Sequence, residues 1–83
     1  MYSIAPLRPD IIAYLRKHHL EKKWQKAHQL FETSPRHPSL HTELLEPKEN
    51  LIYSFRLDRK YRALFIVRAN QVMEIINITN HYS

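Results

Sequence analysis

The clearest pattern in the chain lies between residues 53 and 67, where apolar and polar residues alternate on both sides of a short charged break. This alternation predicts two antiparallel strands joined by a tight turn. A turn over residues 58–60 places Arg56 directly opposite Arg62. Two arginines that face each other on one sheet face repel. Either an anion or a carboxylate lies beside them, or the two side chains diverge into water.

A third strand is predicted after Ala69-Asn70, which suits a two-residue turn. On this turn Val72 pairs with Val67, and Asn77 falls opposite Arg62. One face of the sheet is then apolar and is expected to pack against helices; it carries Leu51, Tyr53, Phe55, Leu57, Tyr61, Phe65, Val67, Val72, Ile76 and Ile78. The other face is mixed. Its polar end carries Arg56, Arg62 and Asn77, and its apolar residues include Ile52, Leu64, Ile66, Met73 and Ile75.

The first half of the chain predicts a short strand over residues 1–5 and two amphipathic helices. Pro9 suits the first turn of the first helix. The apolar residues at helical spacing are Leu7, Ile11 and Leu15 in the first helix and Leu20, Trp24, Ala27 and Phe31 in the second. Ser34-Pro35 ends the second helix, because a residue before proline avoids helical geometry. The cations on the outside of the helices are interpreted as a solvated face.

Residues 35–50 are predicted to form a loop that is long for so small a protein. Long loops in small domains are either functional or disordered. Leu40, Leu44 and Leu45 are expected to anchor this loop to the core. His37 and His41 have the spacing of metal ligands on a helix, but Pro38 between them opposes a helix there. No metal site is therefore predicted.

Composition limits the function classes. The chain has 83 residues, which predicts a single domain over residues 1–83. It has no cysteine for disulfides or thiolate metal sites, and no glycine for a phosphate-binding Gly-rich loop. No apolar run reaches the length of about 20 residues that a membrane helix needs, so a cytoplasmic protein is expected. The net charge of +5 favours a polyanionic partner such as nucleic acid, or an acidic protein.

The order of two helices, a loop, the segment Tyr-Ser-Phe-Arg-Leu-Asp-Arg-Lys-Tyr-Arg-Ala-Leu-Phe at 53–65 and a last strand ending in His-Tyr resembles the RelE/ParE toxin superfamily. Its YoeB-like branch of messenger RNA interferases is the most similar. The resemblance implies an α+β fold, the RelE-like microbial ribonuclease fold. In it, two N-terminal helices pack on one face of a small, mainly antiparallel, twisted sheet.

The resemblance also implies roles for individual residues. Arg62 matches the arginine that holds the scissile phosphate, and Arg56 matches a supporting arginine. Glu43 matches the general base, with Glu46 as a near competitor. His81 matches the general acid, and Tyr82 matches a tyrosine that helps to position the RNA. Further contacts to RNA are expected from Lys48, Arg59 and Lys60.

These residue types suit RNA cleavage without a cofactor, in which the 2′-hydroxyl is the nucleophile and base, cation and acid are supplied by side chains. The implied function is a ribosome-dependent endoribonuclease toxin of a type II toxin–antitoxin system. Its partners would be a cognate antitoxin, the ribosome and mRNA, with no membrane. The assembly would be a homodimer or a toxin–antitoxin heterocomplex. A ParE-like gyrase-binding toxin and a catalytically inactive interaction module of the same fold are the alternatives.

Overall fold

The computed structural model describes residues 2–80, so the predicted site residues His81 and Tyr82 lie outside the described residues. The elements in chain order are β1 (Ser3–Ile4), α1 (Pro9–Lys17), α2 (Glu21–Thr33), η1 (Pro38–Leu40), β2 (Glu43–Leu44), η2 (Lys48–Asn50), β3 (Tyr53–Arg56), β4 (Arg62–Arg68), η3 (Ala69–Gln71) and β5 (Val72–Thr79). The short first strand, both helices and the three long strands are all present, as the sequence predicted.

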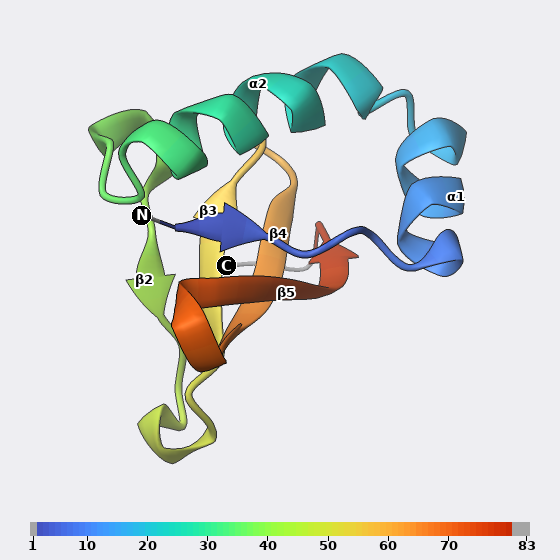
Figure 1. Ribbon diagram of the computed structural model, residues 1–83. Helices are drawn as coiled ribbons and strands as arrows, with labels where there is room; N and C mark the ends of the chain where they lie inside the picture. Colours follow the sequence, from blue (N-terminus) through green and yellow to red (C-terminus); the bar gives the residue numbers. More distant parts are fainter. Residues whose placement is uncertain (1, 81–83) are drawn as a thin grey trace.

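The five strands form one sheet in the order β1-β5-β4-β3-β2. Only the β1–β5 pair is parallel, so the sheet is mainly antiparallel. Both edge strands, β1 and β2, are two residues long. Helix α2 lies across one face of the sheet, and α1 lies to one side of α2 and packs against β5 (Figure 1). The predicted α+β architecture is therefore confirmed. We call the face that carries the helices the inner face and the opposite one the outer face.

An aromatic cluster forms the centre of the core between α2 and the sheet. Phe31 of α2 stacks on Phe55 of β3 at 4.9 Å between ring centroids and meets Phe65 of β4 edge-on at 5.2 Å. Trp24, which lies earlier in α2 than Phe31, also stacks on Phe55, with 6.0 Å between the ring centroids. Leu40 is also buried, which confirms that it anchors the loop. Since Phe55 and Phe65 point to the inner face, their neighbours in sequence point to the outer face.

The predicted register of the last strand is wrong by one residue. The connection after β4 spans Ala69–Gln71, and Arg68 pairs with Val72. Asn70 and Gln71 both have positive φ, at 62° and 60°, so the turn needs one residue more than Ala69-Asn70 supplies. This shift moves every side chain in the first part of β5 to the face opposite to the one predicted.

The shift places Met73 and Ile75 in the core, where they are 3% and 2% exposed, instead of on the outer face. Val72 and Ile76 are correspondingly only partly buried. A bulge at Leu64/Phe65 then restores the expected parity, so that Ile78 is buried as predicted. Thr79, and not Asn77, lies opposite Arg62.

Leu51 was also misplaced by the sequence pattern. It follows η2 with φ 53° and ψ 41°, and it is 59% exposed, so it does not belong to the apolar face. Alternation holds only within a paired strand, and β3 begins two residues later at Tyr53. None of the helices within residues 2–80 is long and apolar enough to span a lipid bilayer.

Candidate functional site

The hairpin of β3 and β4 places Arg56 opposite Arg62, as the sequence predicted. Asp58 shapes the turn: its Oδ1 accepts hydrogen bonds from the amides of Lys60 at 2.8 Å and Tyr61 at 2.7 Å. Its Oδ2 accepts a hydrogen bond from Lys23 Nζ at 2.6 Å, which ties the turn to α2. These hydrogen bonds hold the turn in one conformation, which fixes the register of β3 and β4 and so places the two arginines opposite each other.

Arg62 points to the outer face but is only 5% exposed. Its Nε donates a hydrogen bond to Ser54 Oγ at 3.0 Å, and its Nη2 donates to the carbonyl oxygen of His41 at 2.6 Å. Glu43 Oε1 lies 3.8 Å from the same Nη2. Burial lowers the pKa of Arg62, the carboxylate of Glu43 opposes this shift, and the nearby charge of Arg56 adds to it. The guanidinium is thus held in a defined plane between strands and loop.

The predicted loop supplies both His41 and Glu43, because part of it is ordered against the sheet. His41 has φ 47° and ψ 48°, a left-handed conformation that turns its carbonyl toward Arg62. Thr42 Oγ1 donates a hydrogen bond to the carbonyl of Pro35 at 2.7 Å. The next two residues form β2, in which Glu43 pairs with Ser54 of β3. The sequence did not predict this edge strand.

The structure brings some of the predicted residues together and separates others. Glu43, Arg56 and Arg62 share the outer face at one end of the sheet. Arg59 and Lys60 are exposed in the β3–β4 turn at this same end. Lys48 lies in η2, at the opposite end of β3, so it is not part of the same group (Figure 1).

Glu46 is exposed, lies beyond β2 and forms no ion pair with an arginine within residues 2–80. Glu43 is the glutamate that approaches Arg62. His81 and Tyr82 lie outside the described residues, and they follow Thr79, the partner of Arg62, by two and three positions in the sequence.

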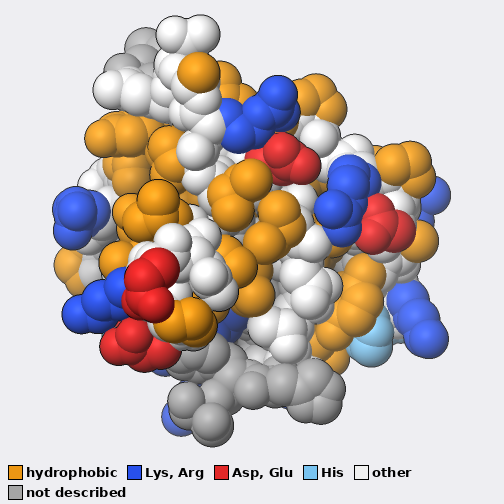
Figure 2. All heavy atoms as spheres, turned by 90° about the horizontal axis from the view of Figure 1, so that it is seen from below, with side chains coloured by type: hydrophobic (Ala, Val, Ile, Leu, Met, Phe, Trp, Pro, Cys, Tyr) orange, Lys and Arg blue, Asp and Glu red, His pale blue; other side chains and the backbone are white. Residues whose placement is uncertain are grey.

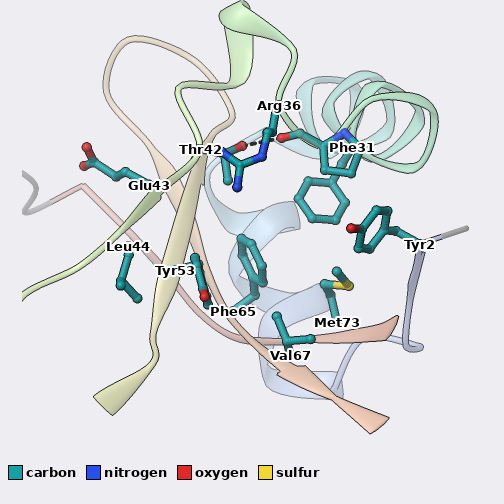
Figure 3. A pocket seen from close by; sticks show the side chains of 11 residues that line it. Tyr2, Phe31, Arg36, Thr42, Glu43, Leu44, Tyr53, Phe65, Val67 and Met73 are labelled. Atoms are coloured by element: carbon teal, nitrogen blue, oxygen red, sulfur yellow. Dashed lines mark hydrogen bonds between the residues drawn. The ribbon is translucent and has the colours of Figure 1, made fainter. Parts of the chain in front are cut away.

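A hollow of about 490 Å³ opens on the inner face, beside the end of α2. Its apolar lining includes Tyr2, Phe31, Phe65 and Met73, whose side chains converge on it (Figure 3). The carboxylate of Glu43 points away from this hollow. Glu43 thus lies at the border between the two: it is among the residues that line this hollow, but its carboxylate approaches Arg62.

Two residues that hold Arg62 were not singled out by the sequence analysis. Ser54 is two residues from Arg56 on the same strand face, so the predicted register already made it a diagonal neighbour of Arg62. The alternation pattern therefore contained enough information to place Ser54 beside Arg62. The contribution of His41 is a backbone carbonyl in a left-handed residue, and no sequence pattern identifies it. Within residues 2–80, no three His, Asp or Glu side chains come together in a way that could hold a metal ion.

In chemical terms, the site combines a pair of guanidinium groups with a carboxylate. The guanidinium groups of Arg56 and Arg62 suit a phosphate, because planar N–H donors match its oxygens. The carboxylate of Glu43 is 44% exposed, so solvent or a ligand can reach it. Two positive charges beside an accessible carboxylate suit a phosphodiester with a proton acceptor next to it. Arg62 is 5% exposed, so it can act on such a ligand mainly through its charge.

Comparison with known proteins gives information mainly on the fold. No protein-family model matches the chain. A stretch of 35 residues is 51% identical to an uncharacterized protein of Haemophilus influenzae, and it covers 42% of this chain and 35% of the length of that relative.

Solved structures match over almost the whole chain. A YoeB/ParE toxin from Agrobacterium tumefaciens superposes with a TM-score of 0.70 at 17% identity, covering 99% of this chain and 100% of that one. A chain of the YoeB-YefM complex from Staphylococcus aureus gives a TM-score of 0.69 at 17% identity, covering 99% of each chain. The protein therefore has the fold of the YoeB/ParE toxins, and the predicted resemblance is confirmed at the level of the fold.

Proposed function

We propose that this protein is the toxin of a type II toxin–antitoxin pair and that it cleaves mRNA on the ribosome as an endoribonuclease. The observation that carries the proposal is the group on the outer face: Arg62 is held in place by Ser54 and His41, Arg56 lies opposite it, and Glu43 lies at 3.8 Å. The YoeB/ParE fold over 99% of the chain supports the same function class.

In the proposed reaction, Glu43 accepts the proton of a ribose 2′-hydroxyl, and the oxygen attacks the adjacent phosphorus. The bond from phosphorus to the 5′-oxygen breaks, and His81 gives a proton to that oxygen. The products are a 2′,3′-cyclic phosphate and a 5′-hydroxyl. Arg62, with Arg56 beside it, stabilises the extra negative charge that develops on the phosphoryl oxygens. Tyr82 positions the RNA, and Arg59 and Lys60 contact its backbone.

Induced expression of the protein in bacteria, with mapping of transcript 5′ ends, tests this proposed function. The expected result is growth arrest with new ends inside translated reading frames, which Arg62→Ala abolishes. The matched control is Arg68→Ala, at the far end of β4, where Arg68 pairs with Glu74 at 3.5 Å. Arrest without new ends, together with inhibition of purified gyrase on supercoiled DNA, would identify a ParE-like toxin instead. Neither arrest nor cleavage would identify an inactive interaction module.

The proposed partner is a small acidic antitoxin, which would bind the outer face of the sheet. Seen from below, hydrophobic side chains occupy much of the middle of the surface, with charged groups around them (Figure 2). On the outer face, Ile52, Leu64 and Ile66 are only partly buried. Leu64 and Ile66 follow Arg62 along the same face of β4, so one partner can cover this apolar surface and the cationic site together. Co-expression of an adjacent acidic protein should relieve arrest, and Ile66→Asp should prevent this relief.

A further inference from the structure

Ser54 is the most buried polar side chain outside the proposed catalytic groups, with 0% of its surface exposed. Burying a hydroxyl without a hydrogen-bond partner costs free energy. Here the hydroxyl accepts a hydrogen bond from Arg62 Nε at 3.0 Å. A serine in the middle of a sheet is otherwise a poor choice, because β-branched and aromatic residues pack better there.

The position of Ser54 links the cation to the proposed base. Ser54 pairs with Glu43 on β2 and with Leu64 on β4, and it lies diagonally across from Arg62. Its small side chain leaves room for the guanidinium to lie over the strand. With Nε held by Ser54 and Nη2 by the carbonyl of His41, the plane of the guanidinium is set by a side chain of β3 and by the backbone of the loop before β2.

We infer that Ser54 is a positioning residue for the cleavage reaction: its Oγ, together with the carbonyl of His41, fixes the Arg62 guanidinium at the correct distance from Glu43. This inference rests on the proposed function. Ser54 does not touch the RNA; it acts through Arg62. A misplacement of about 1 Å in a catalytic group can cost on the order of 100-fold in rate, so holding the guanidinium plane has a measurable consequence.

The test uses Ser54→Ala and Ser54→Cys in a reconstituted translation system with end-labelled mRNA. Cysteine is somewhat larger than serine and alanine is smaller, and neither replaces the hydroxyl as a good acceptor, so a loss of rate common to both variants reports the hydrogen bond and not the packing. Both variants should lower the single-turnover cleavage rate about 10- to 100-fold, as expected for loss of a hydrogen bond to a charged group. Their affinity for ribosomes carrying mRNA with a 2′-deoxy nucleotide at the cleaved position should change by no more than about twofold, because the phosphoryl oxygens carry more negative charge in the transition state than in the ground state.

Two further measurements separate positioning from a merely structural role. In an Arg62→Lys background, which lacks Nε–H, Ser54→Ala should have almost no further effect on the rate, because its action passes through the arginine. By NMR, hydrogen exchange of the Arg62 Nε–H should be slow in the wild-type protein and faster in Ser54→Ala. Ser3→Ala, a serine in the exposed edge strand β1, is the matched control.

The outcomes are distinct. If the wild-type protein cleaves mRNA and Ser54→Ala cleaves equally fast, the inference is wrong while the proposed function stands. If Ser54→Ala slows cleavage equally in the wild-type and Arg62→Lys backgrounds, Ser54 has a structural role only, and the inference is again wrong. If the wild-type protein does not cleave mRNA, the proposed function itself fails, and the positioning role fails with it.

Discussion

The carboxylate of Glu43 offers the sharpest test of the proposed chemistry, because a second glutamate lies three residues away. Glu43→Gln keeps the size of the side chain and leaves the backbone pairing of residue 43 in β2 with Ser54 in β3 intact. It removes the negative charge that lies 3.8 Å from Arg62 Nη2 and the group that would accept the 2′-hydroxyl proton. The substitution should therefore change the free energy of unfolding little and the cleavage rate strongly.

The effect on stability should be small. The side chain of Glu43 is 44% exposed, although that of Arg62 is 6% exposed, and the two lie 3.8 Å apart. Ion pairs between two exposed side chains typically contribute about 0.2–1 kcal/mol. Arg62 keeps its hydrogen bonds to Ser54 and His41, so its burial is still compensated. We expect the free energy of unfolding to fall by less than about 1 kcal/mol.

The effect on cleavage should be large. A positioned general base typically contributes about 10²- to 10⁴-fold to the rate, which corresponds to roughly 3–5 kcal/mol of barrier. The barrier should therefore rise several times more than the stability falls. A residue that only supported Arg62 electrostatically would lower both quantities by similar small amounts.

The assay is single-turnover cleavage of labelled mRNA on purified ribosomes, with urea unfolding of the same protein samples. Glu46→Gln is the matched control: it removes the same charge from an exposed residue that forms no ion pair with an arginine in the described part of the chain. Equal rates for Glu43→Gln and wild type, or a larger loss for Glu46→Gln, would refute the assignment of Glu43 as the base.

Three further predictions concern stability. Phe31→Leu removes two aromatic contacts of about 0.5–1.5 kcal/mol each and should lower the free energy of unfolding in urea by about 1–3 kcal/mol, whereas Ile12→Leu, at a site 37% exposed, should change it little. Burial acts to raise the pKa of Asp58, but the hydrogen bond from Lys23 and those from the turn amides together lower it. The stability that ionised Asp58 adds to the folded protein is therefore complete above the unfolded pKa of about 3.9, and it is lost as the pH falls through the lower folded pKa. The stability gap between wild type and Asp58→Asn should shrink on acidification, and a pH-independent gap would contradict this. Leu51→Asn should raise the melting temperature by up to roughly 8 °C, because an exposed leucine with positive φ costs about 1 kcal/mol or more, and an unchanged or lower melting temperature would be evidence against strain there.

The parts of the fold that follow from local patterns were predictable from the sequence. Helical spacing identified α1 and α2, and alternation identified β3 and β4 with the correct facing of Arg56 and Arg62. These features depend on residues that are close in sequence, so period and turn length determine them.

The parts that the sequence did not predict depend on backbone conformations that leave little trace in residue type. Asn70 and Gln71 both adopt positive φ, and this lengthened the turn and moved Met73 into the core. The bulge at Leu64/Phe65 then shifted the pairing again, so that Thr79 faces Arg62. Within the loop, a left-handed His41 allows a backbone carbonyl to complete the site.

The very short edge strands have a consequence for how copies of this protein behave at high concentration. A sheet edge with a long row of free amide and carbonyl groups is a template on which further chains can add, which leads to fibrils. Strands of only two residues, β1 at one edge and β2 at the other, offer almost no such template. Since the helices cover the inner face, we expect contacts with other molecules mainly on the outer face of the sheet, where side chains, and not main-chain groups, select the partner.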